Sequence, residues 1–205
     1  MGSATAAPAG MARGDQGDLP GGFPGDLGEL LICGFSGSTP ASRSARWLAR
    51  QIREGRVAGA FFVKENVGSL DEVVDLTQLF SRGAPRPPIL AIDHEGGAVQ
   101  RLVERHGLDR LPSAKRVAAT RSVDEARALY ARAGGGMARL GFNLNLAPDV
   151  DLDEPRNPAI GGFGRSFSDD SQVVVAYARA FIDGFASAGV GCVLKHFPGA
   201  GGAKE

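Results

Sequence analysis

The sequence predicts an α/β protein built as a (β/α)8 TIM-type barrel, C-terminally truncated to about the first five strand–helix units. Three observations predict this fold class. Short apolar runs alternate with helical patterns from residue 28 onward, most of these runs are continuously apolar, and polar residues stand where several runs end. Continuous apolar strands separated by helices indicate parallel strands buried on both faces. Polar groups at strand ends are typical of barrels, where they converge on one rim.

Five apolar runs are predicted to be strands, at residues 30–35, 57–63, 89–92, 142–147 and 190–194. A doubly wound sheet is the alternative, but no glycine-rich phosphate turn follows the first run, so we favour the barrel. A complete barrel has eight strands in roughly 250 residues. We therefore expect the remaining strands to lie beyond Glu205, and we divide the chain into a disordered N-terminal arm, 1–27, and a partial barrel domain, 28–205.

Four helices are predicted between these strands, at residues 42–56, 69–81, 122–140 and 168–188. Ser122 and Glu125 have the spacing of a capping box at the start of the third helix, and Gly141 stands where that helix should stop. Ser168 is predicted to cap the fourth helix, since two acidic residues follow it and complement the positive end of the helix dipole.

Composition excludes several classes of protein. The chain has 23 basic and 23 acidic residues and is 43% hydrophobic, as in ordinary globular proteins rather than disordered or membrane proteins. No block of like charge is long enough to follow a nucleic-acid backbone. Arginines recur at helical spacing between residues 43 and 56, which we interpret as a solvated helix face. We expect neither a nucleic-acid partner nor a membrane partner.

The two cysteines, Cys33 and Cys192, lie inside apolar runs, where a free thiol behaves as a small hydrophobic group. Reduced thiols indicate a reducing compartment. The first residues lack the cationic start and apolar run of a signal peptide. These features together predict a cytoplasmic protein.

Asp93 and Glu95 follow the third predicted strand, two residues apart, so in extended geometry both side chains point the same way. They could form a paired-carboxylate site, or a carboxylate could cap the Gly96-Gly97 turn that follows. We expect ligand contact for Asp93 ahead of Glu95, and Arg101 could return to the same cleft.

An acidic cluster at 149–154 resembles the start of a calcium loop, but the glycine and glutamate that such a loop requires at its sixth and twelfth positions are absent. We expect turns and salt bridges there, and no metal. Lys195 and His196 end the fifth predicted strand. They could bind the acidic cluster, but we favour contact with the hydroxyl or carbonyl oxygens of a ligand.

Together these segments resemble the N-terminal barrel domain of family 3 glycoside hydrolases, and within it the bacterial β-N-acetylhexosaminidases of cell-wall recycling. The segments that carry the resemblance are Asp-His-Glu-Gly-Gly at 93–97 with the trailing Arg101, residues 143–148, Asn-Pro at 157–158, Arg-Ser-Phe at 165–167 and Lys-His-Phe-Pro-Gly at 195–199. The resemblance implies that Asp93 binds sugar hydroxyls and that Arg101 and Arg165 shape the pocket for the terminal sugar. It also implies that Lys195 and His196 hydrogen-bond the same sugar.

The implied function is hydrolysis of terminal β-linked N-acetylglucosamine from glycosides or muropeptides, without a cofactor, through a covalent glycosyl-enzyme intermediate. In this family the nucleophilic Asp and the acid/base His would both lie beyond Glu205, so this chain would supply mainly the sugar-binding part. Ala200 and Gly202 stand where many members carry His and Asp. The alternatives are a β-glucosidase of the same family or a non-catalytic carbohydrate-binding module, and an open barrel could self-associate through its sheet edges.

Overall fold

The structure is a computed structural model, and it describes residues 27–202. Its main feature is a five-stranded sheet in which all neighbours run parallel. The strands follow in the order β1 (Ile32–Gly34), β2 (Gly59–Phe62), β3 (Ile89–Ile92), β6 (Leu144–Asn145) and β7 (Gly191–Cys192). The predicted α/β class with parallel strands is therefore confirmed. The predicted barrel is not confirmed, since the sheet of residues 27–202 is open, with β1 and β7 at its edges.

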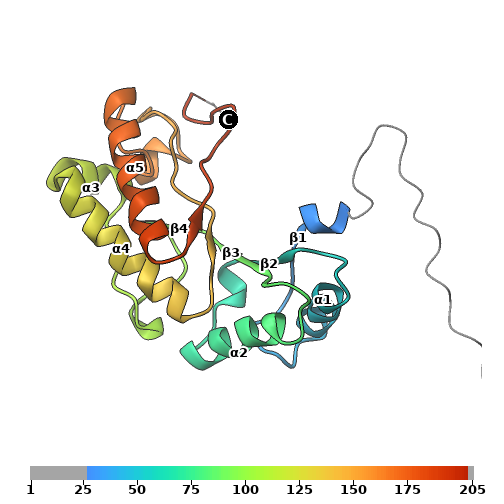
Figure 1. Ribbon diagram of the computed structural model, residues 1–205. Helices are drawn as coiled ribbons and strands as arrows, with labels where there is room; N and C mark the ends of the chain where they lie inside the picture. Colours follow the sequence, from blue (N-terminus) through green and yellow to red (C-terminus); the bar gives the residue numbers. More distant parts are fainter. Residues whose placement is uncertain (1–26, 203–205) are drawn as a thin grey trace, which may run out of the picture.

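Helices connect the strands and pack in pairs. They are α1 (Arg43–Arg53), α2 (Leu70–Ser81), α3 (Ala114–Thr120), α4 (Val123–Arg139) and α5 (Ser171–Ser187). Helices α1 and α2 contact one another near β1 and β2, whereas α4 and α5 lie side by side and α5 contacts β7 (Figure 1). Short 3-10 helices occur at Leu27–Leu30, Lys64–Asn66, Glu104–His106 and Gly161–Phe163. None of the helices within residues 27–202 is both long enough and apolar enough to cross a membrane.

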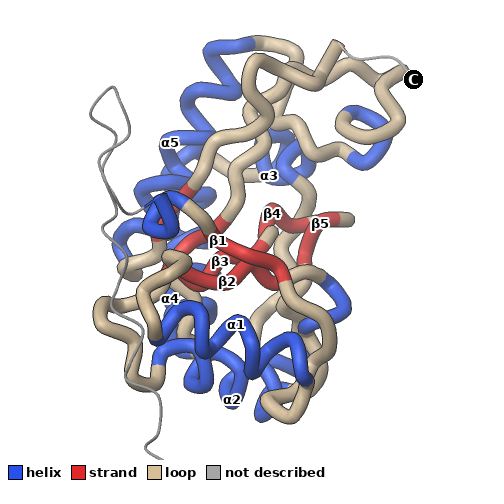
Figure 2. The backbone as a smooth tube through the Cα atoms, turned by 90° about the vertical axis from the view of Figure 1, so that its right-hand side faces the viewer, coloured by secondary structure: helices blue, strands red, loops and turns tan. Residues whose placement is uncertain are grey.

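Besides the 3-10 helices, a hairpin and a short α-helix were not predicted. A small antiparallel hairpin, β4 (His94–Gly96) and β5 (Val99–Gln100), follows β3 directly and lies beside the main sheet (Figure 2). Its turn uses Gly96 and Gly97 with φ of 107° and 56°, a backbone conformation that glycine adopts without steric cost. The second is α3, a helix of seven residues whose N-cap, Ser113, accepts a hydrogen bond from the Arg116 amide.

The predicted N-cap of α4 is confirmed and that of α5 is wrong. Ser122 and Glu125 form the reciprocal capping box. In α5 the cap is Asp170, whose side chain accepts a hydrogen bond from the Gln172 amide. The Ser168 carbonyl instead accepts hydrogen bonds from the Asp153 amide and the Ser166 hydroxyl, and these bonds hold Ser168 in the preceding loop.

The last two strands are shorter than predicted, with two residues each. Pro148, three residues after β6, has no amide hydrogen to donate to a ladder. The segments that follow β6 and β7 continue side by side, since the Lys195 amide donates to the Pro148 carbonyl and Asp149 forms an isolated parallel bridge with Lys195. This continuation brings the residues after β6 next to those after β7.

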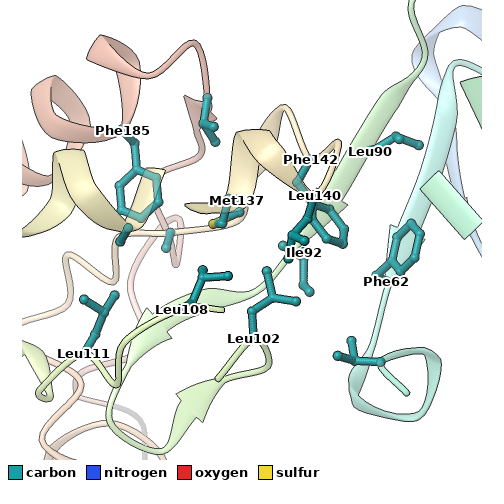
Figure 3. Packing of buried hydrophobic residues seen from close by; sticks show 14 of the residues in the cluster. Phe62, Leu90, Ile92, Leu102, Leu108, Leu111, Met137, Leu140, Phe142 and Phe185 are labelled. Carbon is teal, nitrogen blue, oxygen red and sulfur yellow. The ribbon is translucent and has the colours of Figure 1, made fainter. Parts of the chain in front are cut away.

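The core joins the sheet to the helices. Phe62 of β2 is fully buried and meets three other phenylalanine rings edge-on, at centroid distances of 4.9 to 5.8 Å. Figure 3 shows Phe62 and Phe142 on either side of the chain that carries Leu90 and Ile92, with Met137 and Leu140 of the α4 end close by. Such edge-to-face contacts add to the stabilisation that burial of each ring provides.

We expect the Phe62→Ala substitution to lower the free energy of unfolding by about 3 to 5 kcal/mol, because it leaves a cavity among the rings. The matched control is Phe163→Ala, since the Phe163 side chain is 59% exposed and should cost less than about 1 kcal/mol. Urea denaturation followed by circular dichroism measures both. Similar losses in the two variants would contradict this description of the core.

Candidate functional site

Charged side chains meet at the carboxyl ends of the parallel strands. Asp93 follows β3, Glu95 lies in β4, and Lys195 follows β7. The Lys195 ammonium nitrogen, Nζ, lies 2.7 Å from Asp93 Oδ1 and 2.5 Å from Glu95 Oε1. A single cation thus joins two carboxylates that are about 100 residues away from it in the sequence.

Arg165 completes this network from the loop that follows the 3-10 helix Gly161–Phe163. Its Nε and Nη2 donate to the two oxygens of Glu95 at 2.9 and 2.8 Å, and its Nη1 donates to the Ala159 carbonyl at 3.0 Å. Burial tends to raise the pKa of Glu95, but the hydrogen bonds from Arg165 and the charge of Lys195 together bring that pKa below its ordinary value. Glu95 is therefore a buried carboxylate that stays ionised.

A second group of side chains lies beside this network. His196 Nδ1 is 2.6 Å from Asp151 Oδ2, and the Ala200 amide donates to Asp151 Oδ1 at 2.5 Å. Burial tends to raise the pKa of Asp151, but the hydrogen bonds from Ala200 and His196 lower it overall. Asp149 differs, since burial, together with the neighbouring Asp151 charge, raises its pKa to about 7.

The structure brings together four of the five predicted site residues: Asp93, Arg165, Lys195 and His196. Arg101, which follows β5, has no hydrogen bond or ion pair with them within residues 27–202. His196 makes the contact with the acidic cluster that was the alternative to ligand binding, whereas Lys195 binds Asp93 and Glu95 instead.

Sequence reasoning ranked Glu95 below Asp93 and assigned Asp149 and Asp151 to turns. Asp149 does accept a turn hydrogen bond from the Asp151 amide, and Lys115 pairs with Asp153, so the expected turns and salt bridges are present. The central position of Glu95 between two cations was missed, although its spacing from Asp93 was the signal that could have indicated it.

A cavity of about 530 Å³ opens beside these residues. Asp151, Lys195 and His196 line it together with the turn at 197–199. This volume lies in the range of small-molecule sites. Carboxylates accept hydrogen bonds from hydroxyl groups and cations donate to oxygens, so the lining suits a polyhydroxylated ligand.

We expect Arg165→Met to lower the free energy of unfolding by about 3 kcal/mol, because it leaves the buried Glu95 with Lys195 as its remaining charged partner. The control, Arg127→Met, removes an exposed ion pair with Asp124 and should change stability by less than about 1 kcal/mol. Equal losses in the two variants would show that the Glu95 pair is not a structural requirement. Chemical denaturation provides the comparison.

His94 gives the protein a dependence on pH. Its ring is fully buried, neither ring nitrogen has a hydrogen-bond partner, and burial, followed by the charge of Arg101, lowers its pKa to about 4. An unfolded histidine has a pKa of about 6.5. The folded state therefore resists protonation, and stability that is complete above about pH 6.5 is lost as the pH falls toward 4.

We expect the titration of His94 to lower the free energy of unfolding by about 2 kcal/mol when the pH falls from 7.5 to 5. The His94→Leu variant, which has no group to titrate at this position, should lose that much less over the same range. Thermal and urea unfolding at both pH values measure the difference. An identical pH dependence in the two proteins would contradict the assignment.

Comparison with known proteins shows the family to which the chain belongs. Residues 26–205 match the family described as "Glycosyl hydrolase family 3 N terminal domain". The "Beta-hexosaminidase" of Xylella fastidiosa strain 9a5c is 38% identical over 182 residues, which are 86% of this chain and 52% of the relative. That of Stenotrophomonas maltophilia strain K279a is 38% identical over 178 residues, 84% of this chain and 50% of the relative. The chain thus spans about half the length of these curated relatives.

Solved structures agree with the sequence relatives. The β-N-acetylhexosaminidase from Beutenbergia cavernae superposes with a TM-score of 0.75 at 31% identity, over 88% of this chain and 55% of that one. A glycoside hydrolase family 3 β-N-acetylglucosaminidase from a Paenibacillus strain gives 0.74 at 31% identity, over 86% of this chain and 33% of that one. The resemblance that the sequence motifs indicated is confirmed, and the chain belongs to the family of glycosyl hydrolase family 3 N-terminal domains.

Proposed function

We propose that this chain supplies the sugar-binding part of a glycoside hydrolase that acts on terminal β-linked N-acetylglucosamine. The observation that carries the proposal is the network in which Lys195 joins Asp93 and Glu95 at the carboxyl ends of the strands. Barrel enzymes place their binding groups at this edge. The printed name of the Paenibacillus structure, a β-N-acetylglucosaminidase, supports N-acetylglucosamine as the sugar and favours it over the glucose of the β-glucosidase alternative.

The members of the network have different roles in this proposal. The Asp93 side chain is 21% exposed and the Lys195 side chain 17%, so both have surface with which to meet sugar hydroxyls. Glu95 is 4% exposed and binds two cations, so it positions Lys195 and Arg165 rather than contacting the sugar. His196, whose side chain is 37% exposed, presents its ring at the cavity and donates or accepts a further hydrogen bond.

The chemistry of hydrolysis belongs to residues outside the described part of the chain. A retaining mechanism needs a nucleophilic carboxylate and an acid/base group on either side of the glycosidic bond. We assign neither role to residues 27–202, because the carboxylates of the site, Asp93, Glu95, Asp149 and Asp151, are engaged in ion pairs or a turn. In this proposal the described residues bind and orient the sugar, and an aspartate and a histidine beyond Glu205 carry out the displacement.

We also propose that the sheet is part of a (β/α)8 barrel. Apolar side chains are exposed at both sheet edges, Leu30 and Leu31 before β1 and Val193 and Leu194 after β7, as expected of surfaces that further strands cover.

We further propose that the substrates are muropeptides and that the protein is cytoplasmic. Free Cys33 and Cys192 are consistent with a reducing compartment.

The test is the binding of N-acetylglucosamine and of glucose to the protein, measured by isothermal titration calorimetry. We expect Asp93→Ala to weaken N-acetylglucosamine binding by about tenfold or more, because a charged hydrogen bond contributes about 1.5 to 3 kcal/mol. Asp75→Ala, on the exposed side of α2, is the matched control and should leave affinity unchanged. Unchanged affinity in Asp93→Ala would exclude this site, and tighter binding of glucose would favour the β-glucosidase.

A further inference from the structure

Three side chains of types that bind metal ions come together where the segments after β6 and β7 run side by side. Asp149, Asp151 and His196 each offer one atom, and these atoms all lie within 4.8 Å of one another. The parallel bridge between Asp149 and Lys195 fixes this approach. Asp149 and Asp151 are 2% and 5% exposed, so the group is largely enclosed.

One carboxylate of this group, Asp149, has an oxygen that lacks the partner its burial requires. Asp149 Oδ2 is buried and accepts no hydrogen bond. Its nearest cation is Arg165 Nε at 3.6 Å, and that nitrogen donates its hydrogen to Glu95. The other Arg165 nitrogens contact the Ala159 carbonyl, Glu95 and, at 3.4 Å, His196 Nε2. A buried carboxylate oxygen without a donor is costly, so this position indicates a cation that bonds it directly.

The balance of charges around the group also favours a bound cation. The contacts at this edge of the sheet join two permanent cations, Lys195 and Arg165, to three carboxylates, Asp93, Glu95 and Asp149. A fourth carboxylate, Asp151, pairs with His196. Both cations are held by Glu95. Within residues 27–202 no permanent cation lies at hydrogen-bond distance from Asp149 or Asp151, so when both carboxyl groups are ionised negative charge exceeds positive charge in a partly buried place.

We propose that Asp149, Asp151 and His196 form a binding site for a divalent transition-metal ion of the Zn²⁺ class. One imidazole with two carboxylates is a ligand set that suits Zn²⁺ and leaves its fourth position open, whereas Mg²⁺ and Ca²⁺ prefer oxygen ligands alone. The sequence pattern excluded a calcium loop at 149–154, but it could not include His196, which arrives from another strand.

The site needs a small adjustment to accept the ion. Ligands of a tetrahedral Zn²⁺ at roughly 2.0 to 2.1 Å lie about 3.3 Å apart. His196 Nδ1 and Asp151 Oδ2, now 2.6 Å apart, must therefore separate by less than about 1 Å, and a pair at the 4.8 Å limit of the group must approach by about 1.5 Å. The His196 side chain is 37% exposed and has room to move, whereas both carboxylates are held by their surroundings.

The experiment titrates Zn²⁺ into chelator-stripped protein by calorimetry, without sugar, so the result is independent of the proposed glycosidase function. The protein carries Cys33→Ser and Cys192→Ser so that thiols do not bind the ion. We expect one Zn²⁺ per chain, and a loss of about tenfold or more in affinity for both Asp149→Asn and His196→Ala. Asp153→Asn, which removes the carboxylate that pairs with Lys115, is the matched control and should bind as tightly as the parent.

Asp149→Asn keeps the side-chain oxygen that accepts from the Asp151 amide, so it should remain folded, and circular dichroism checks this. His196→Ala removes a partly exposed group and gives a second, independent variant. The proposal is overturned if Zn²⁺ does not bind stoichiometrically, if folded Asp149→Asn and His196→Ala bind it as the parent does, or if Asp153→Asn loses affinity equally. Co²⁺ in place of Zn²⁺ should give the visible absorption of a four-coordinate ion.

Discussion

The arrangement of side chains at the carboxyl ends of the parallel strands depends on the buried carboxylate of Glu95. Glu95 sits in the β4–β5 hairpin with 4% of its side chain exposed, and an unpaired charge in such a place costs several kcal/mol. Its two partners, Arg165 and Lys195, come from 70 and 100 positions further along the chain. Satisfying one charge therefore fixes the hairpin, the loop after the 3-10 helix Gly161–Phe163 and the end of β7 relative to one another.

Much of the fold could be predicted because periodicity and capping are local signals. The α4 capping box of Ser122 and Glu125 and the bounds of β3 are as expected. Ser168 was mistaken for the cap of α5, since its actual partners, such as the Asp153 amide, lie in another segment. The hairpin was missed because two- and three-residue strands have too few positions to show alternation. Whether the sheet closes is not a local property, and apolar runs do not report it.

In the site, too, local sequence patterns predicted some features, whereas features that depend on distant parts of the chain were missed. Polar residues at the ends of β3 and β7 were expected to converge, because parallel strands direct their carboxyl ends to one edge, and Asp93 and Lys195 do meet there. Arg165 stands in a loop and was found through family motifs rather than through strand pattern. Which carboxylate would hold two cations depends on depth of burial. Sequence spacing gives Asp93 and Glu95 the same direction but not the same depth.

The two groups of side chains at this edge are not independent. Arg165 contacts Glu95 on one side and lies within 3.6 Å of Asp149 on the other, and its Nη2 is 3.4 Å from His196 Nε2. A ligand that draws His196 or Arg165 toward itself therefore changes the charge that Asp149 and Asp151 experience. Coupling between two binding events is reciprocal, so if the proposed cation and sugar both bind here, the factor by which the cation alters sugar affinity equals the factor by which sugar alters the affinity for the cation. An arginine shared between two carboxylates is the physical link that carries this effect.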